Sequence, residues 1–131
     1  MARASNLAFA ALLCLGFAAP GAFAQAPPQV ERAPLQSSEW PVGYNATTMT
    51  ATFKANGALP RHTHPGVEHG YVLEGGLVLK IDGKPDLDLK PGDSWTVPAN
   101  IPHSATGGAA RAKVHVSCVV DKTRPFSSPA P

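Results

Sequence analysis

Short stretches of alternating apolar and polar residues recur along the chain, and this pattern is typical of β-strands. Residues 44–53, YNATTMTATF, alternate and are rich in Thr, and residues 112–120, AKVHVSCVV, alternate most regularly. Because successive side chains of a strand point to opposite faces, a period of two predicts strands with one apolar face. No stretch of the sequence shows the longer period of an amphipathic helix.

Turn-forming residues separate these runs. Asn-Gly, Gly-Gly and Asp-Gly pairs are strong turn signals, and a Lys-Pro-Gly-Asp sequence acts similarly. Further short strands are predicted between them, at residues 77–82, 86–89 and 94–98. Several short strands at this spacing predict an all-β sandwich or barrel, which we place at residues 44–121.

The first 24 residues follow a different pattern. Arg3 precedes an apolar stretch at residues 7–19, after which come Pro20, Gly21 and small residues ending at Ala24. This arrangement predicts a secretory signal peptide, residues 1–24, cleaved after Ala24. The apolar stretch is too short to span a bilayer, so a retained membrane anchor is the weaker alternative. We therefore expect a periplasmic or secreted protein that is not attached to a membrane after cleavage.

The segments on either side of the predicted barrel lack strand patterning. Residues 25–43 are rich in Pro, Ala, Gln and Ser, which indicates either an extended N-terminal arm or a disordered linker. As an arm, this segment could lie along the domain or a neighbouring subunit, with Trp40 as its anchor. Residues 122–131 contain three Pro and three Ser or Thr, so we expect a flexible C-terminal tail.

Charge and cysteine content exclude two possibilities. Loss of Arg3 leaves ten Lys and Arg against nine Asp and Glu, a balance that implies neither a nucleic-acid-binding surface nor attraction to an anionic membrane. Cleavage also removes Cys14, so Cys118 has no partner for an internal disulfide.

The candidate chemistry lies in residues 61–76, RHTHPGVEHGYVLEGG, which hold three of the five histidines. His62 and His64 are two residues apart, so on a strand both imidazoles leave the same face. A Pro-Gly turn follows, after which Glu68 opens a second extended run that can return a carboxylate to the same point. His103 is the best candidate for a fourth ligand. This spacing predicts a metal site.

These residues resemble the two short motifs of the cupin superfamily. The first motif is matched by Gly57, His62, His64, Glu68 and Gly75, and the second by Gly92, Pro98 and His103. The resemblance implies a small single-domain cupin, an antiparallel double-stranded β-helix or jelly-roll barrel, that forms a homodimer. It also assigns the metal ligands as His62, His64, Glu68 and His103.

Imidazole nitrogens and one carboxylate suit a divalent transition metal ion, and Fe, Mn, Cu, Ni and Zn remain candidates. Four protein ligands leave one or two positions open on an ion that accepts five or six. The resemblance implies many activities on small molecules, among which we favour oxidation of the dioxygenase type. The alternatives are a periplasmic protein that binds a metal or small ligand without catalysis, and a non-redox isomerase or lyase.

Other polar residues near this stretch have less certain roles. His69 and Tyr71 alternate with Glu68, so both are expected on the opposite face of the strand. His115 shares its face with a lysine, which favours solvent over the barrel interior. Cys118 lies among valines and is expected to fill space, whereas Trp95 is expected in the core, where its N–H needs a partner.

Overall fold

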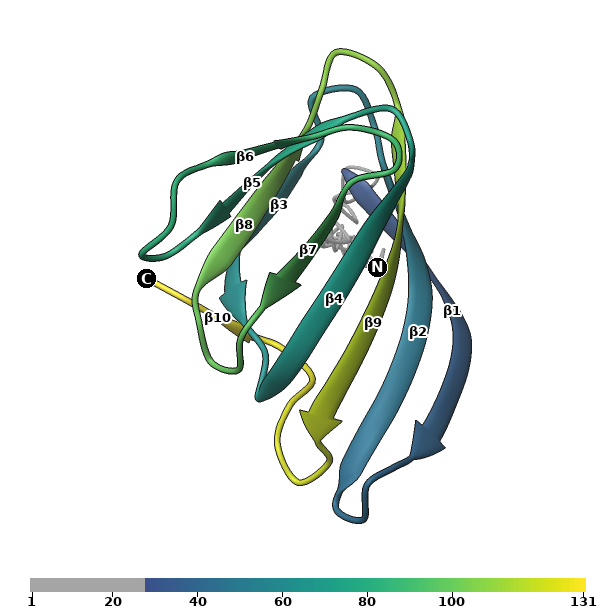
Figure 1. The fold of residues 1–131 in the computed structure, drawn as a ribbon, viewed down its shortest axis with the longest axis vertical. Helices are drawn as coiled ribbons and strands as arrows, with labels where there is room; N and C mark the ends of the chain where they lie inside the picture. The colour runs from purple at the N-terminus through teal and green to yellow at the C-terminus, as the bar shows by residue number, and fades with distance from the viewer. Residues whose placement is uncertain (1–27) are drawn as a thin grey trace, which may run out of the picture.

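The protein folds as two antiparallel β-sheets in the computed structural model, which describes residues 28–131 (Figure 1). The first sheet has the order β1 (Val30–Glu39), β2 (Tyr44–Phe53), β9 (Ala112–Asp121), β4 (Gly66–Glu74) and β7 (Ser94–Val97). The second has the order β10 (Ser128–Pro129), β3 (Ala58–Thr63), β8 (His103–Gly107), β5 (Leu77–Ile81) and β6 (Leu87–Leu89).

This architecture confirms the predicted all-β jelly-roll fold. Between residues 28 and 131 no helix is long and apolar enough to cross a bilayer. The predicted signal peptide, residues 1–24, lies outside the described part of the chain.

The apolar faces of the two sheets meet in one core. In β9 the buried residues alternate strictly with half-buried ones, as the sequence pattern predicted. Val72, Val97, Val114 and Phe53 are among the least exposed members of this core. Burial of these side chains removes apolar surface from water, which favours folding and holds the two sheets face to face.

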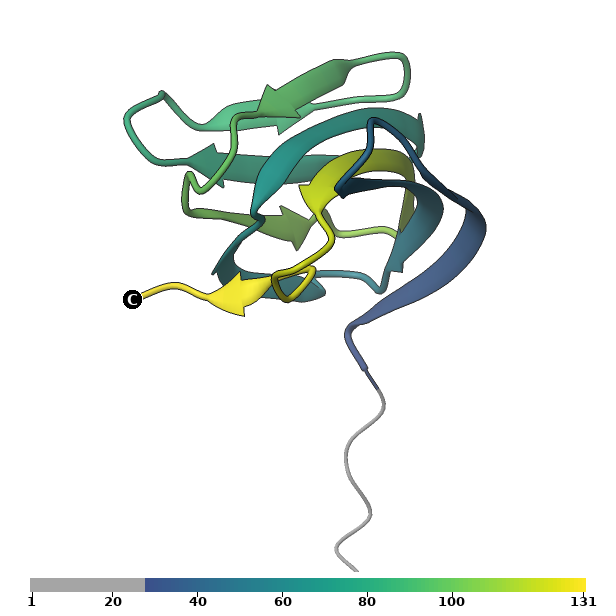
Figure 2. The same ribbon diagram turned by 90° about the horizontal axis from the view of Figure 1, so that it is seen from below.

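The N-terminal arm is extended and belongs to the first sheet. β1 runs antiparallel to β2 along its whole length, from Val30 opposite Phe53 to Glu39 opposite Asn45, with an irregularity after Pro34. The arm is thus an edge strand of its own chain, at the outer side of the barrel in Figures 1 and 2. Trp40 is 73% exposed at the end of this strand and is not anchored on the described part of the chain.

The C-terminal segment differs from the flexible tail that the sequence led us to expect. After residue 122 the chain turns back across the barrel, where Ser128 and Pro129 pair with Thr63 and His62 of β3 (Figure 2). Arg61 holds the segment further, since its side chain donates to the carbonyl of Pro131 and its own carbonyl accepts from the amide of Ala130. Backbone pairing therefore orders a segment that has few apolar side chains of its own.

Candidate metal centre

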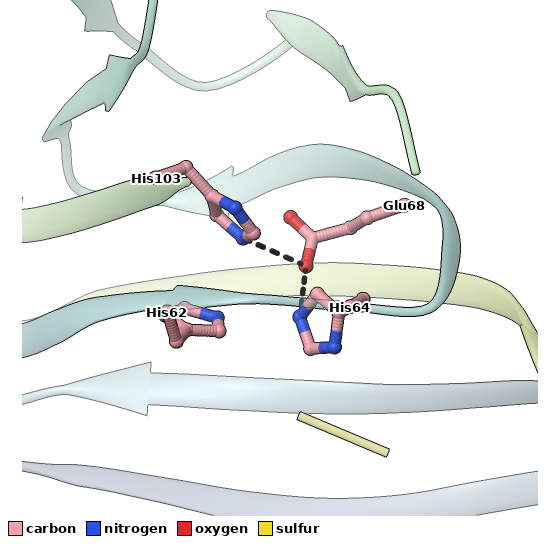
Figure 3. A group of neighbouring side chains, drawn as sticks. All are labelled: His62, His64, Glu68 and His103. Atoms are coloured by element: carbon pink, nitrogen blue, oxygen red, sulfur yellow. Dashed lines mark ion pairs between the residues drawn. The ribbon is translucent and has the colours of Figure 1, made fainter. Parts of the chain in front are cut away.

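The four predicted ligands converge from both sheets on one point inside the barrel (Figure 3). His62 lies on β3, His64 follows the end of that strand, and His103 begins β8 directly opposite His62. Glu68 comes from β4 in the other sheet. The chain reaches β4 through a close approach at Gly66, where a side-chain Cβ would lie 1.9 Å from the carbonyl oxygen of Val119. Only glycine allows that approach, which brings Glu68 opposite the histidines.

All four residues are buried, with exposed fractions of 9% or less. One potential ligand atom from each lies within 4.8 Å of the others. Ligand atoms bound at about 2.0–2.2 Å from one ion can be at most about 4.4 Å apart. Small side-chain movements therefore suffice to close this group around an ion.

Main-chain carbonyls orient all three imidazoles. The Nδ1 atoms of His62 and His103 each lie within hydrogen-bond distance of a carbonyl two residues earlier, at 2.7 Å from Pro60 O and 2.9 Å from Ile101 O. His64 Nδ1 is 2.6 Å from the carbonyl oxygen of Phe126. Because a carbonyl can only accept, each Nδ1 carries the proton and donates it. Each Nε2 is thereby left with a lone pair that can bind a metal.

A buried atom without a hydrogen-bond partner supports this fit. His103 is 1% exposed, and its Nε2 makes no hydrogen bond within the described chain. Its nearest acidic neighbour is Glu68 Oε2 at 3.7 Å, which is too far for a hydrogen bond. A buried polar atom left unpaired costs free energy, and a metal ion bound at this nitrogen would remove that cost. The group therefore fits a divalent transition metal ion.

Glu68 remains ionised despite its burial. Burial alone would raise its pKa, but contacts with His103, His64 and Trp95 lower that pKa well below its usual range. Oε2 lies 3.2 Å from His64 Nε2, while Oε1 accepts a 2.9 Å hydrogen bond from the indole N–H of Trp95. The two carboxylate oxygens thus have different tasks, since Oε1 is held by the indole and Oε2 faces the histidines.

The indole N–H of Trp95 has a buried hydrogen-bond partner, which we expected from the sequence. It lies on β7 opposite Gly70 of β4, and its ring occupies the space above that glycine, where a Cβ would come within 1.9 Å of the indole. The indole is therefore packed as well as hydrogen-bonded, which fixes the carboxylate of Glu68 in one orientation.

The two histidines that face each other respond oppositely to their surroundings. Burial lowers the pKa of His62 and outweighs the hydrogen bond to Pro60. For His103, burial is the largest influence and acts to lower the pKa, but the Glu68 carboxylate and the Ile101 carbonyl together outweigh it, so the net pKa is raised. His103 therefore binds a proton more readily than an ordinary histidine does. A proton on its Nε2 must leave before a metal ion can bind at that atom.

The C-terminal segment completes the site. Besides accepting from His64, Phe126 packs its ring against that imidazole, with the ring centroids 4.9 Å apart at 66°. Phe126 and Ser127 also form part of the cavity wall. No feature of the sequence indicated this role, because Phe126 contributes a main-chain oxygen to His64, which any residue could supply.

A cavity of about 160 Å³ adjoins the four ligands inside the barrel. Its wall is mainly apolar and comes from both sheets. Besides the ligands and Trp95, the polar side chains in the wall are those of Arg32, Cys118 and Ser127. The apolar lining residues are Met49, Ala51, Phe53, Leu59, Leu77, Leu79, Ala105, Val114, Val116 and Phe126.

The other polar residues of these strands lie either on the outer face of the sheet, as the alternation predicted, or within the core. His69 donates to or accepts from Thr96 at the surface, and Tyr71 is 46% exposed. His115 lies opposite Tyr71 on the outer face of the sheet and does not line the cavity. Cys118 is 1% exposed, and burial, together with nearby Glu68, raises the pKa of its thiol to about 12. It therefore stays a neutral thiol near neutral pH.

Comparison with known proteins identifies the family. The Cupin domain family matches residues 49–118, more than half of the chain, and this stretch contains all four candidate ligands. The chain therefore belongs to the cupin family.

One relative of known activity is a 3-hydroxyanthranilate 3,4-dioxygenase from Mycosarcoma maydis, which is 35% identical over 86 residues. The match covers 63% of this chain and 45% of the relative, so the chain spans less than half the length of that enzyme.

Solved structures share the fold at lower identity. A cupin-like protein from Thermotoga maritima has a TM-score of 0.66 at 23% identity, covering 79% of this chain and 77% of the other. An oxalate oxidase has a TM-score of 0.65 at 23% identity over 82% and 58% of the two chains. The DMSP lyase DddQ from Ruegeria pomeroyi has a TM-score of 0.60 at 22% identity over 65% and 43%. Similar barrels thus carry different activities.

The indole hydrogen bond predicts that Trp95→Phe weakens metal binding. Phenylalanine retains most of the packing over Gly70 but cannot donate to Glu68 Oε1, so the carboxylate loses its fixed orientation. We expect metal affinity to fall about 10- to 100-fold, as for other residues that orient a ligand. Competition with a chelator of known affinity measures this. Trp40→Phe, at an exposed indole, is the matched control. Equal affinities for Trp95→Phe and Trp40→Phe would refute the orienting role.

The C-terminal segment yields a second prediction. A chain ending at Thr123 lacks the Phe126 carbonyl, so His64 is free to rotate or to change tautomer. We expect its metal affinity, measured in the same competition, to fall about 10-fold or more. Phe126→Ala retains the carbonyl and removes only the ring, so it should bind metal almost as the full chain does. A loss of affinity in Phe126→Ala as large as in the truncated chain would assign the effect to the ring instead.

Proposed function

We propose that this protein is an exported, metal-dependent cupin enzyme that oxidises a small organic molecule with O₂, in a reaction of the dioxygenase type. The observation that carries the proposal is a set of four buried ligands adjoining a partly open, mainly apolar cavity. Such a cavity admits a small molecule beside the ion while keeping most water away.

A bound divalent ion would supply a Lewis acid and, if it is redox-active, a position at which O₂ can react. The protein supplies the rest. His62, His64 and His103 present their Nε2 atoms, and Glu68 offsets part of the ion's charge. The Trp95 indole holds Glu68, and the apolar wall orients the substrate and excludes water.

The residues of the cavity wall favour oxidation over proton-transfer chemistry. A lyase or isomerase needs a group that removes a proton from its substrate. Among the described lining residues outside the ligand set, Cys118 is neutral, Arg32 is a permanent cation and Ser127 is a weak base. Glu68 is a poor base because its pKa is so low. Incorporation of both atoms of O₂ into the substrate balances without an external reductant, and the dioxygenase relative adds support.

The main alternative is a binding protein without catalysis. Metal uptake outside the cytoplasm favours copper or zinc by intrinsic affinity, and zinc would not support oxidation by O₂. The DMSP lyase that shares the fold keeps a lyase reaction as a further alternative. Metal identity separates these alternatives from the proposed oxidation.

Metal content and oxygen consumption together test the proposal. Protein purified without an affinity metal should contain close to one Fe, Mn, Cu or Ni ion per chain and consume O₂ with a phenolic or dicarbonyl compound. His62→Ala should lose both the ion and the oxygen uptake. His69→Ala is the control, since His69 lies on the same segment but bonds Thr96 at the surface. Zinc without oxygen uptake would contradict oxidation and favour the alternatives.

Export and dimerisation complete the proposal. Residues 1–24 have the features of a signal peptide, so N-terminal sequencing of the protein from the periplasm or medium should begin at Gln25. A protein that begins at Met1 there would contradict cleavage. The exposed Trp40 and Val42 at the β1–β2 connection are large apolar residues that a second subunit could cover. Elution of the mature protein as a monomer in size-exclusion chromatography would contradict the homodimer.

A further inference from the structure

Arg32 is a cavity residue that lies outside the group of metal ligands. It lies on β1 opposite Ala51, and it shares its face of the strand with Val30, a member of the core. Arg32 lines the cavity beside the ligands and also an adjoining surface hollow, which shares Leu59, His62 and Ser127 with that cavity. Arg32 therefore lies where the cavity opens to solvent.

The charge of Arg32 is not balanced by an acidic side chain. Within residues 28–131, Arg61 pairs with Asp82 and Arg111 pairs with Glu74, but no carboxylate lies within ion-pair distance of Arg32. Apart from Glu68, no acidic side chain among residues 28–131 lines the cavity. Three neutral imidazoles and one carboxylate around a divalent ion leave a net charge of about +1. The loaded cavity is thus positive at both its metal centre and its mouth.

The size and lining of the cavity restrict what can bind. A volume of about 160 Å³ is close to that of an engineered cavity, about 150 Å³, that binds benzene in another protein. It is well below the roughly 300–1,000 Å³ of pockets for drug-sized ligands. The part of a ligand that lies inside the cavity is therefore limited to about one ring or a short chain.

We propose that Arg32 binds the carboxylate of a small apolar acid, an aromatic acid with one ring or a short-chain acid, whose apolar body occupies the cavity beside the metal. This inference rests on the proposed function and specifies its substrate class. A guanidinium binds a carboxylate through two parallel hydrogen bonds, which is the arrangement that an unpaired arginine at an apolar opening can offer. The inner wall then selects for size, and Arg32 selects for charge.

Paired probes that differ only in charge test the inference. Zinc-loaded full-length protein does not oxidise the probe, so isothermal titration calorimetry can compare benzoate with the neutral benzamide. We expect the wild type to prefer benzoate. Arg32→Gln should weaken benzoate binding about 10- to 100-fold, as expected for loss of a hydrogen bond between charged groups, and leave benzamide binding unchanged. Arg32→Lys, which keeps the charge without the planar fork, should lose less.

The control is Arg124→Gln, which removes an arginine outside the cavity wall and should change neither probe. Equal benzoate affinity in the wild type and Arg32→Gln would overturn the inference, because the carboxylate would then be bound by the metal instead. An equal loss for both probes would also overturn it, since Arg32 would only shape the opening. Failure of benzoate to bind the wild type, or a preference for benzamide, would exclude the proposed substrate class.

These outcomes are separable from failure of the proposed oxidation. Arg32 is not a metal ligand, so Arg32→Gln should retain the metal content and thermal stability of the wild type, which the same preparations check. Normal metal content and oxygen uptake with unchanged benzoate binding would contradict only the role of Arg32. If the wild type binds benzoate through Arg32 but shows no metal-dependent oxygen uptake, only the proposed oxidation would be contradicted.

Discussion

The orientation of three imidazoles by three main-chain carbonyls is the constraint on which the site depends. Each carbonyl accepts a hydrogen bond from the Nδ1–H of one histidine, so the Nε2 of that histidine keeps its lone pair and faces the same point. Two of the carbonyls lie two residues before their histidine, whereas the third comes from the C-terminal segment. The indole N–H of Trp95 orients the carboxylate of Glu68 by donating a hydrogen bond to its Oε1. Ligand direction is thus set by a second layer of hydrogen bonds within a packed barrel.

In this arrangement the residues that hold the ion are distinct from those that select the small molecule that binds beside it. The donors lie deep between the two sheets, where they are at most 9% exposed. Among the described residues that line the cavity next to them, no further side chain is suited to remove a proton. A reactant there meets a metal centre, an apolar wall and one arginine. Those three elements limit the chemistry more than the fold does, because barrels of this shape occur in an oxalate oxidase and in a DMSP lyase alike.

Sequence alone predicted the features that depend on local pattern. The alternation in residues 112–120 predicted β9 and its inward face, and the spacing of His62, His64 and Glu68 predicted their convergence. The sequence did not predict the ordered C-terminal segment, since backbone hydrogen bonds between residues more than sixty positions apart leave no mark on residue type. Arg32 was missed for a related reason. Its role depends on how β1 pairs with β2, and residues 25–43 lack the alternation that would reveal a strand.

The hydrogen bond from His64 to residue 126 has a consequence for how this protein can diversify. The acceptor is a backbone oxygen, so the identity of the side chain at that position is not fixed by the metal site. That side chain nevertheless forms part of the wall, as does Arg32 from the opposite end of the described chain. Both positions can therefore change through evolution, or be randomised in a library, to alter which molecule enters while the ion and its four donors are inherited intact.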